Sequence, residues 1–360
     1  MLSPPASVRG RREVGPVSAH NPIVSPADPQ TGRRTRVAVP ATGDPPGMDI
    51  LRSLVETQGY FLRREALELG FTDRVLTNGV RDKTWKRIRQ GAYCHREVWA
   101  GLSAEERHAV RAHAAYRIID GEVALSHVTA LVEFGCALWN APLDVTHVIR
   151  RDEGSSRREA GTVHHTGLLL PGDLVERDGR WLTSPARSAI EAATLMTVES
   201  GLVVLDWMLH HGLVTIEELW AVHRRMKHWP RTLRLELTLR LADGRSESVG
   251  ETRARYLFWR MGLPAPELAY KIYDEAGRLV AVCDFAWPEH GVYGEFDGKV
   301  KYGRLLKDGQ TAGDVVFEEK KREDLVRRLT NGTVVRWTWS ELTPTSGPSL
   351  QALQLLRVAA

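Results

Sequence analysis

Apolar side chains recur every three to four residues near the start of the regular pattern, at Ile50, Leu51, Leu54 and Val55. This spacing predicts an amphipathic helix that begins at about Met48. Two further helical segments follow, "LRREALELG" and "TDRVLTNGV", and Thr72 stands where a helix N-cap is expected. Three short helices in close succession predict a helix-turn-helix.

The next segment, "RDKTWKRIRQGAYCH", interleaves aromatic and basic residues, and Gly91 supplies a turn. This pattern predicts a β-hairpin of the kind that forms a wing. Over residues 81–96 the only acid is Asp82, and the basic residues are Arg81, Lys83, Lys86, Arg87, Arg89 and Arg96. These six residues form a predicted basic ridge. The ridge either binds DNA phosphates, whose contacts supply most of the non-specific affinity for DNA, or is a solvated face of the hairpin.

Residues 115–193 alternate apolar and polar positions over short strands and then become helical. The segment "LTSPARSAIEAA" predicts a helix with Ser184 as its cap and Pro185 in its first turn. Metal ligation is one interpretation of the histidines of this region, which are His127, His147, His164 and His165. No carboxylate or cysteine stands at ligand spacing beside them, so the favoured interpretation is hydrogen-bonded structural histidines in a non-catalytic region.

The pattern changes again after helices expected over residues 202–240, which a break at Gly212 divides. The elements expected beyond them are a helix from residue 250, strands over 267–274, 279–288 and 291–302, a charged helix over 315–330, and a strand over 333–342. A turn at Glu275–Gly277 connects the first two strands. This is a compact α/β order.

Several charged residues interrupt these apolar strands. Alternation places Glu295, Asp297 and Lys299 on one face, and Asp284 lies near the end of the neighbouring strand. Crowded acids are unfavourable unless a cation lies among them, and their hard oxygen ligands suit Mg²⁺ or Mn²⁺. Such an ion polarises a phosphodiester and activates water, while an ammonium orients that water or neutralises developing charge. The alternative is a hairpin with exposed charges that turns at Asp297–Gly298.

Composition sets the broader limits. The chain has 360 residues, 42% hydrophobic and 26% charged, which suffices for two or more domains with their own cores. Its three cysteines lack paired spacing, so they indicate neither disulfides nor a zinc site. No apolar run is long enough to span a membrane, and a cytoplasmic protein is expected.

Residues 1–47 contain six arginines, three acids and nine of the chain's 18 prolines. This composition predicts disorder, because it offers no apolar period and too many prolines for a helix or sheet. The favoured explanation is that translation starts at Met48, and the alternative is a basic tail that binds nucleic acid.

The stretch "GYFLRREALELGFTDRVLTNGVRDKTWKRIRQGAYCHREVW" resembles the N-terminal winged-helix domain of AbiEi-type antitoxins, over roughly residues 50–100. The following region resembles the one that succeeds this domain in actinobacterial AbiEi-like proteins. The resemblance implies DNA binding through the basic ridge. It also implies a second copy of the chain, or a cognate toxin, as a protein partner.

The motifs "GETR", "VCDFAWP", "GEFDGKVKY", "EEKKRED" and "VVRWTW" resemble the Vsr-like branch of the PD-(D/E)XK endonuclease fold. This resemblance implies that Asp284 is the first acid and that Glu251 completes the acidic shell. The acid-x-lysine half-motif fits in two registers, one ending at Lys299 and one that puts Asp297 in the lysine's place. The resemblance to the Vsr-like branch implies the second register, which leaves the role of Lys299 open. In the charged helix, Lys320 and Arg322 would face the scissile phosphate, although a solvated salt-bridged face also explains them.

We therefore predict an α+β protein of several domains, with an N-terminal winged helix-turn-helix, a mixed middle region and a C-terminal α/β domain of restriction-endonuclease-like fold. The predicted boundaries are 1–47, 48–100, 101–200, 201–245 (a helical linker), 246–345 and 346–360 (a tail). The first functional hypothesis is an endonuclease that depends on Mg²⁺ or Mn²⁺ and acts in defence, toxin-antitoxin systems or repair. The second is a catalytically inactive, antitoxin-like DNA-binding regulator. A nucleotidyltransferase is disfavoured because its Gly-Ser and Asp-x-Asp pattern is absent.

Overall fold

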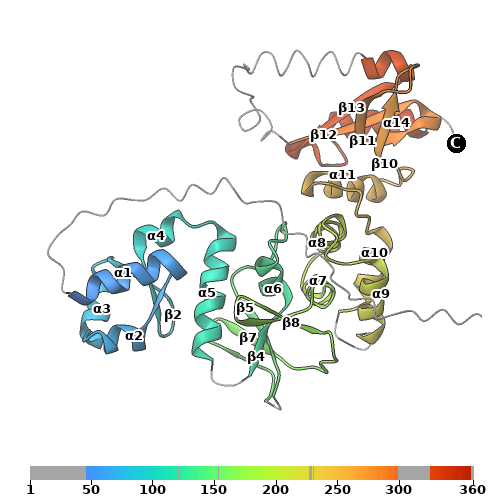
Figure 1. Ribbon diagram of the computed structural model, residues 1–360. Helices are drawn as coiled ribbons and strands as arrows, with labels where there is room; N and C mark the ends of the chain where they lie inside the picture. The colour runs from blue at the N-terminus through green and yellow to red at the C-terminus, as the bar shows by residue number, and fades with distance from the viewer. Residues whose placement is uncertain are drawn as a thin grey trace, which may run out of the picture. The chain divides into compact units, whose positions relative to one another are not determined.

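The structure is a computed structural model that describes residues 46–119, 122–152, 154–226, 229, 231–298 and 325–357. Of the predicted segment 1–47, only the last two residues are described, and they belong to the first helix. The described residues form a mixed α and β structure with three sheets (Figure 1). None of the described helices is long and apolar enough to cross a membrane.

The amino-terminal region consists of short helices and a small antiparallel sheet. Its elements are α1 (Pro46–Gln58), β1 (Phe61–Leu62), α2 (Arg63–Glu68), α3 (Asp73–Arg81), β2 (Trp85–Arg89) and β3 (Ala92–His95). The three predicted helices and the predicted hairpin are confirmed, with Gly91 in the turn at φ +78°. Thr72 caps α3 as expected, because its hydroxyl accepts a hydrogen bond from the backbone N of Val75.

The middle region is built on a six-stranded sheet in the order β6-β7-β5-β4-β9-β8. Its elements are α4 (Arg96–Gly101), α5 (Ala104–Ile118), β4 (Val123–Leu125), α6 (His127–Glu133), β5 (Thr146–Arg150), β6 (Arg157–Glu159), β7 (Thr162–His165), β8 (Leu174–Arg177), β9 (Arg180–Thr183), α7 (Pro185–Thr194), α8 (Val198–His210), α9 (Ile216–Arg225) and α10 (Leu233–Leu241). Strand β5 pairs in parallel with β7 and antiparallel with β4. Ser184 occupies the predicted cap position of α7, but its side chain makes no capping hydrogen bond.

Two predicted boundaries pass through shared cores rather than linkers. Helix α5 contributes Val110 and Ala114 to the amino-terminal core and Ala112 to the core of the six-stranded sheet. The boundary predicted at residue 200 lies inside α8, which packs with α6, α7, α9 and α10 in one apolar cluster. The segment predicted as a helical linker is therefore part of the middle region's core.

The carboxyl-terminal region has a four-stranded sheet in the order β10-β11-β12-β13, in which only β12 and β13 are parallel. Its elements are α11 (Val249–Arg260), β10 (Glu267–Tyr273), β11 (Leu279–Trp287), η1 (Pro288–His290), β12 (Val292–Asp297), β13 (Thr333–Thr338), η2 (Trp339–Glu341) and α14 (Gly347–Arg357), and residues 325–330 are also helical. The predicted order of elements is confirmed where the residues are described.

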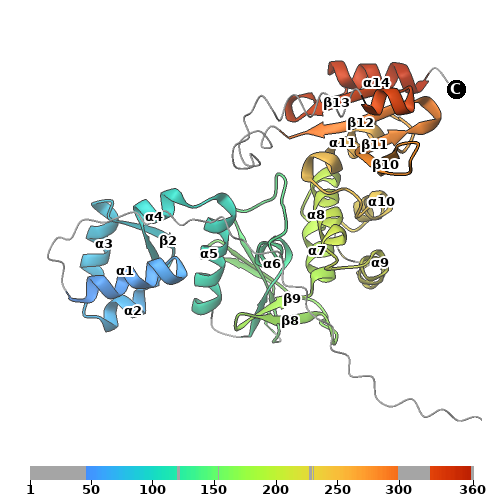
Figure 2. The same cartoon turned by 45° about the horizontal axis from the view of Figure 1, so that its top comes forward.

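Helices cover this sheet, as Figure 2 shows for α11 and α14. Phe258 of α11 and Leu356 of α14 share one apolar cluster with Phe285 and Trp337 of the sheet. Val326 belongs to a second cluster with Tyr293. The prediction of a tail after residue 345 was wrong, because residues 347–357 form a helix whose apolar positions complete the core.

Candidate functional site

Two adjacent strands carry the predicted acids. Asp284 lies on β11, and Glu295 and Asp297 lie on β12. The register pairs Phe285 with Gly294, so the next pair in the same register is Asp284 with Glu295. The Asp284 carboxylate accepts a hydrogen bond from the backbone N of Phe296 at 2.7 Å. The fold thus brings Asp284 against the short backbone segment that joins Glu295 to Asp297.

A cation that sequence reasoning missed lies beside these acids. Arg336 is in register with Glu295 across the parallel pair β12–β13, and its Nη2 is 3.0 Å from Glu295 Oε2. The two side chains are 30% and 14% exposed, so the pair is largely shielded from water. An arginine inside the otherwise apolar strand "VVRWTW" was the available signal. The Arg336 guanidinium therefore balances the negative charge of one of the three acids, Glu295.

Glu251 has a structural role at the start of α11. Its Oε1 accepts a hydrogen bond from the Ser248 hydroxyl at 2.7 Å, and its Oε2 accepts one from the backbone N of Glu247 at 2.8 Å. The Ser248 hydroxyl in turn accepts from the backbone N of Glu251. This reciprocal arrangement stabilises the helix N-terminus. Both carboxylate oxygens thus take part in capping, a role that the predicted acidic shell did not include.

Three predicted site residues, Lys299, Lys320 and Arg322, lie outside the described residues. The register of the acid-x-lysine motif therefore stays a prediction, as does the role of the charged helix.

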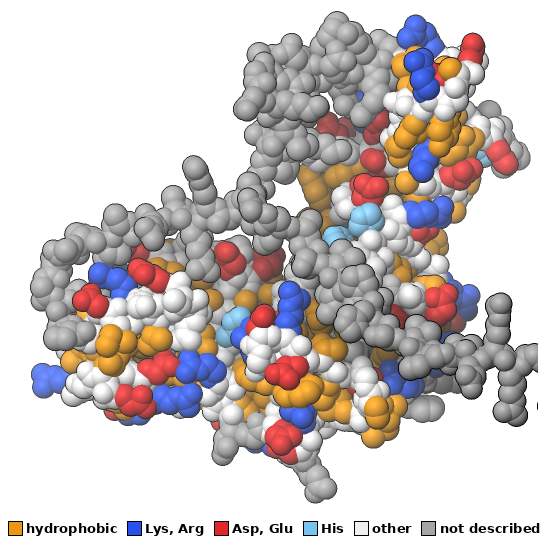
Figure 3. All heavy atoms as spheres, viewed as in Figure 1, with side chains coloured by type: hydrophobic (Ala, Val, Ile, Leu, Met, Phe, Trp, Pro, Cys, Tyr) orange, Lys and Arg blue, Asp and Glu red, His pale blue; other side chains and the backbone are white. Residues whose placement is uncertain are grey.

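The predicted DNA-binding residues differ in their exposure. Arg81, Lys83, Lys86 and Arg87 are exposed at the end of α3, in the turn and on β2. Arg89 is only partly exposed, and its buried Nε and Nη1 have no hydrogen-bond partner among the described residues. Burial lowers the pKa of this guanidinium. Figure 3 shows both basic and acidic side chains on the visible face of the molecule.

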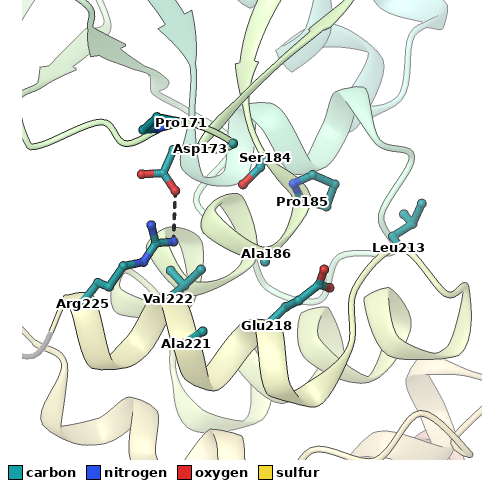
Figure 4. A pocket seen from close by; sticks show the side chains of 11 residues that line it. Pro171, Asp173, Ser184, Pro185, Ala186, Leu213, Glu218, Ala221, Val222 and Arg225 are labelled. Carbon is teal, nitrogen blue, oxygen red and sulfur yellow. Dashed lines mark hydrogen bonds and ion pairs between the residues drawn. The ribbon is translucent and has the colours of Figure 1, made fainter. Parts of the chain in front are cut away.

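A pocket of about 250 Å³ lies between the loop before β8 and helices α7 and α9 (Figure 4). Asp173 and Arg225 meet there, with Oδ1 and Nη2 3.0 Å apart. Asp173 also binds the buried Arg187 at 2.6 Å, and Glu218 accepts a hydrogen bond from the backbone N of Thr215 at the start of α9. The charged groups that line the pocket are thus paired with other groups of the protein, and we assign no ligand to the pocket.

The histidines of the middle region are brought together more closely than the sequence indicated. Ligand atoms of His127, His147 and His165 all lie within 4.8 Å of one another, and this is the one such group of three found among the described residues. His164 lies next to His165 along β7, where alternation directs its side chain to the other face of the sheet. The sequence analysis named these histidines as possible metal ligands, but it did not predict that β5 pairs with β7, which brings His147 and His165 together.

Comparison with known proteins adds relatives without a described activity. No protein-family model matches the chain. Two proteins of Mycobacterium tuberculosis are similar to it, Uncharacterized protein MT2308 of strain CDC 1551 / Oshkosh and Uncharacterized protein Rv2248 of strain ATCC 25618 / H37Rv. Each is 28% identical over 243 residues, which is 63% of this chain and 87% of the relative.

Proposed function

We propose that the protein is a DNA endonuclease that uses a divalent metal ion at Asp284, Glu295 and Asp297. The observation that carries the proposal is the hydrogen bond from the Phe296 backbone to Asp284, since it holds the Asp284 carboxylate against the backbone between Glu295 and Asp297. The ligand atoms of these three described acids do not lie within 4.8 Å of one another as those of the histidine group do, so metal binding would draw the acidic side chains together. Oxygen ligands of this kind suit Mg²⁺ or Mn²⁺. The ion would polarise the scissile phosphate and lower the pKa of the attacking water.

The amino-terminal region supports DNA as the substrate. Helices α2 and α3 followed by the β2–β3 hairpin are the element order expected for a winged helix, and Lys86 and Arg87 are exposed on that hairpin. Exposed cations on such a hairpin would bind phosphates. The resemblance of this region to antitoxin DNA-binding domains supports the same role.

The test is the conversion of supercoiled plasmid to nicked or linear DNA, with Mg²⁺, with Mn²⁺ and with EDTA. Cleavage should need the metal and should be lost in Asp284→Asn, because one ligand fewer weakens both metal binding and water activation. Glu289→Gln is the matched control, since this exposed acid lies in η1 after the same strand. Metal-independent cleavage that persists in Asp284→Asn would contradict the proposed site.

Lys299→Ala and Asp297→Asn then decide the register of the motif. If the lysine has the acid-x-lysine role, Lys299→Ala should reduce cleavage by about 10²-fold or more, as for loss of one electrostatic stabiliser. If Asp297 takes that place, Asp297→Asn should be the severe variant and Lys299→Ala the mild one.

The hairpin is tested separately by DNA binding without metal. Replacing Lys86 and Arg87 with alanine should weaken binding and reduce the slope of log affinity against log salt by about 0.9 for each phosphate that the variant no longer neutralises. Arg89→Ala is the matched comparison, because this partly buried side chain should change the salt slope little. A slope that is unchanged in the double variant would exclude the hairpin as the phosphate-binding surface.

A second candidate function is a non-catalytic DNA-binding regulator. The ion pair between Glu295 and Arg336 favours it, because it balances a site acid without any metal. This function predicts DNA binding with ordinary salt dependence and no plasmid cleavage with either metal. The plasmid and binding assays together therefore distinguish the two candidates.

A further inference from the structure

Three histidines from three different elements converge in the middle region. His127 is the first residue of α6, His147 lies on β5 and His165 lies on β7. Nδ1 of His147 is 2.9 Å from Nε2 of His165, and the rings of His127 and His165 stack with centroids 3.9 Å apart. His127 and His147 are 5% and 6% exposed. His165 is partly exposed, so water is largely excluded from two of the three rings and reaches the third.

Strand pairing explains why two of the rings meet. Ile149 and His165 are in register across the parallel pair β5–β7, and His147 lies two residues before Ile149. Residues two apart share a face of a strand, so His147 and His165 project to the same side.

The backbone holds the third ring in place. His127 has a φ of +53°, in the left-handed region that non-glycine residues rarely adopt. The preceding residue, Ser126, donates its backbone N–H to the carbonyl of His147 at 3.0 Å. A constrained conformation at a convergent side chain is typical of positions with a function beyond packing.

Charged and polar neighbours complete the surroundings. Glu191 Oε2 is buried, makes no hydrogen bond among the described residues and lies 3.5 Å from Nδ1 of His127, while Arg187 binds the other oxygen at 2.7 Å. The Thr129 hydroxyl accepts a hydrogen bond from the backbone N of His147 and contacts the ring of His108. Nδ1 of His127 is also 3.0 Å from the Ser126 hydroxyl, which is its hydrogen-bond partner. A hydrogen-bonding group on the nitrogen that does not bind the metal is the usual way in which proteins orient a metal-binding imidazole.

We propose that His127, His147 and His165 bind one divalent transition-metal ion of the zinc class, with the Glu191 carboxylate near Nδ1 of the His127 ring. Three imidazoles suit zinc, and they do not suit Mg²⁺, which prefers oxygen ligands. Nitrogen ligands of tetrahedral zinc are roughly 3.3 Å apart, so modest side-chain rotations convert the observed spacing into a coordination sphere. Because its three ligands come from three elements, the ion would tie β5 and β7 to α6.

The protonation states agree with this geometry. Burial, together with the neighbouring histidines, lowers the pKa of His147 to about 3 and that of His165 to about 4, and holds the pKa of His127 well below its usual value. Three neutral imidazoles are the form that binds metal, so little proton release is needed at neutral pH.

The experiment uses the full chain without a histidine tag, treated with chelator and then titrated with Zn²⁺ or with Co²⁺ as a spectroscopic probe. We expect one ion per chain, a higher melting temperature with Zn²⁺ and no competition from excess Mg²⁺. X-ray absorption at the zinc edge of the unmodified protein should show imidazole nitrogen and no sulfur. Absence of stoichiometric binding, or sulfur ligation, would overturn the proposal.

Two variants make the assignment specific. His147→Gln should weaken Zn²⁺ binding by about 100-fold or more. Loss of a group that only hydrogen-bonds to a metal ligand weakens binding by about 10- to 100-fold, and loss of the ligand itself should cost at least as much. His290→Gln, which changes a histidine of η1, should bind Zn²⁺ as the unmodified protein does. If His147→Gln does not fold, the absorption spectrum of the unmodified protein still decides the outcome. Equal affinity in a folded His147→Gln variant would also overturn the proposal.

Discussion

Asp206 offers a test of how burial and ion pairing compete in this protein. Its side chain is 1% exposed, and its carboxylate accepts hydrogen bonds from the backbone N of Asp243, the hydroxyl of Thr252 and the guanidinium of Arg255. These contacts join α8 to the start of α11. Despite them, burial raises the pKa of Asp206 to about 6, from 3.8 in an unfolded chain.

The sign of the pH dependence follows from these pKa values. Between pH 4 and pH 6 the folded state keeps the Asp206 proton that the unfolded state has lost, so the free energy of unfolding falls as pH rises through this window. Each pKa unit between the folded and unfolded states corresponds to about 1.4 kcal/mol of unfolding free energy. The change in the Asp206 pKa from 3.8 to about 6 therefore lowers the unfolding free energy by about 3 kcal/mol between pH 4 and pH 6. Asp206→Asn removes this titration and keeps the size of the side chain.

The assay is urea unfolding of both proteins at several pH values from 4 to 7.5. The unfolding free energy of the unmodified protein minus that of Asp206→Asn should fall by about 3 kcal/mol over this range. This difference between the two proteins removes the contribution of the other titrating groups, because both proteins share them. If Arg255 instead dominates, the pKa of Asp206 lies below 3.8 and the difference rises or stays level, which would refute the reasoning.

Two further predictions concern helix starts and packing. Thr72→Ala should lower the free energy of unfolding by about 1 kcal/mol because it removes a capping hydrogen bond, whereas Ser184→Ala should change it by less than about 0.5 kcal/mol because that side chain makes none. Denaturant unfolding of both variants checks this, and equal losses would contradict it. Gly250→Ala should destabilise by about 1–3 kcal/mol, since its added Cβ would overlap the ring of Phe296. A melting temperature that is unchanged in Gly250→Ala would show that the ring can move aside.

The sequence by itself determined the local elements. Apolar periodicity located α1, α2, α3 and the β2–β3 hairpin, and it located α11 and the strands of the carboxyl-terminal sheet. It also put Asp284, Glu295 and Asp297 on neighbouring strands, because alternation along a strand and order along the chain are local properties. These features needed no knowledge of distant residues.

Only the tertiary structure decided which distant residues meet. Arg336 pairs with Glu295 because β13 lies parallel to β12 in one particular register, and His165 reaches His147 through the parallel pairing of β5 with β7. The segment that was predicted to be a tail is the helix α14, because its apolar residues Ala352 and Leu356 pack in one cluster with residues of the sheet. Periodicity states which side of an element is buried, but the partner and the register depend on the packing of the whole core, which no local pattern encodes.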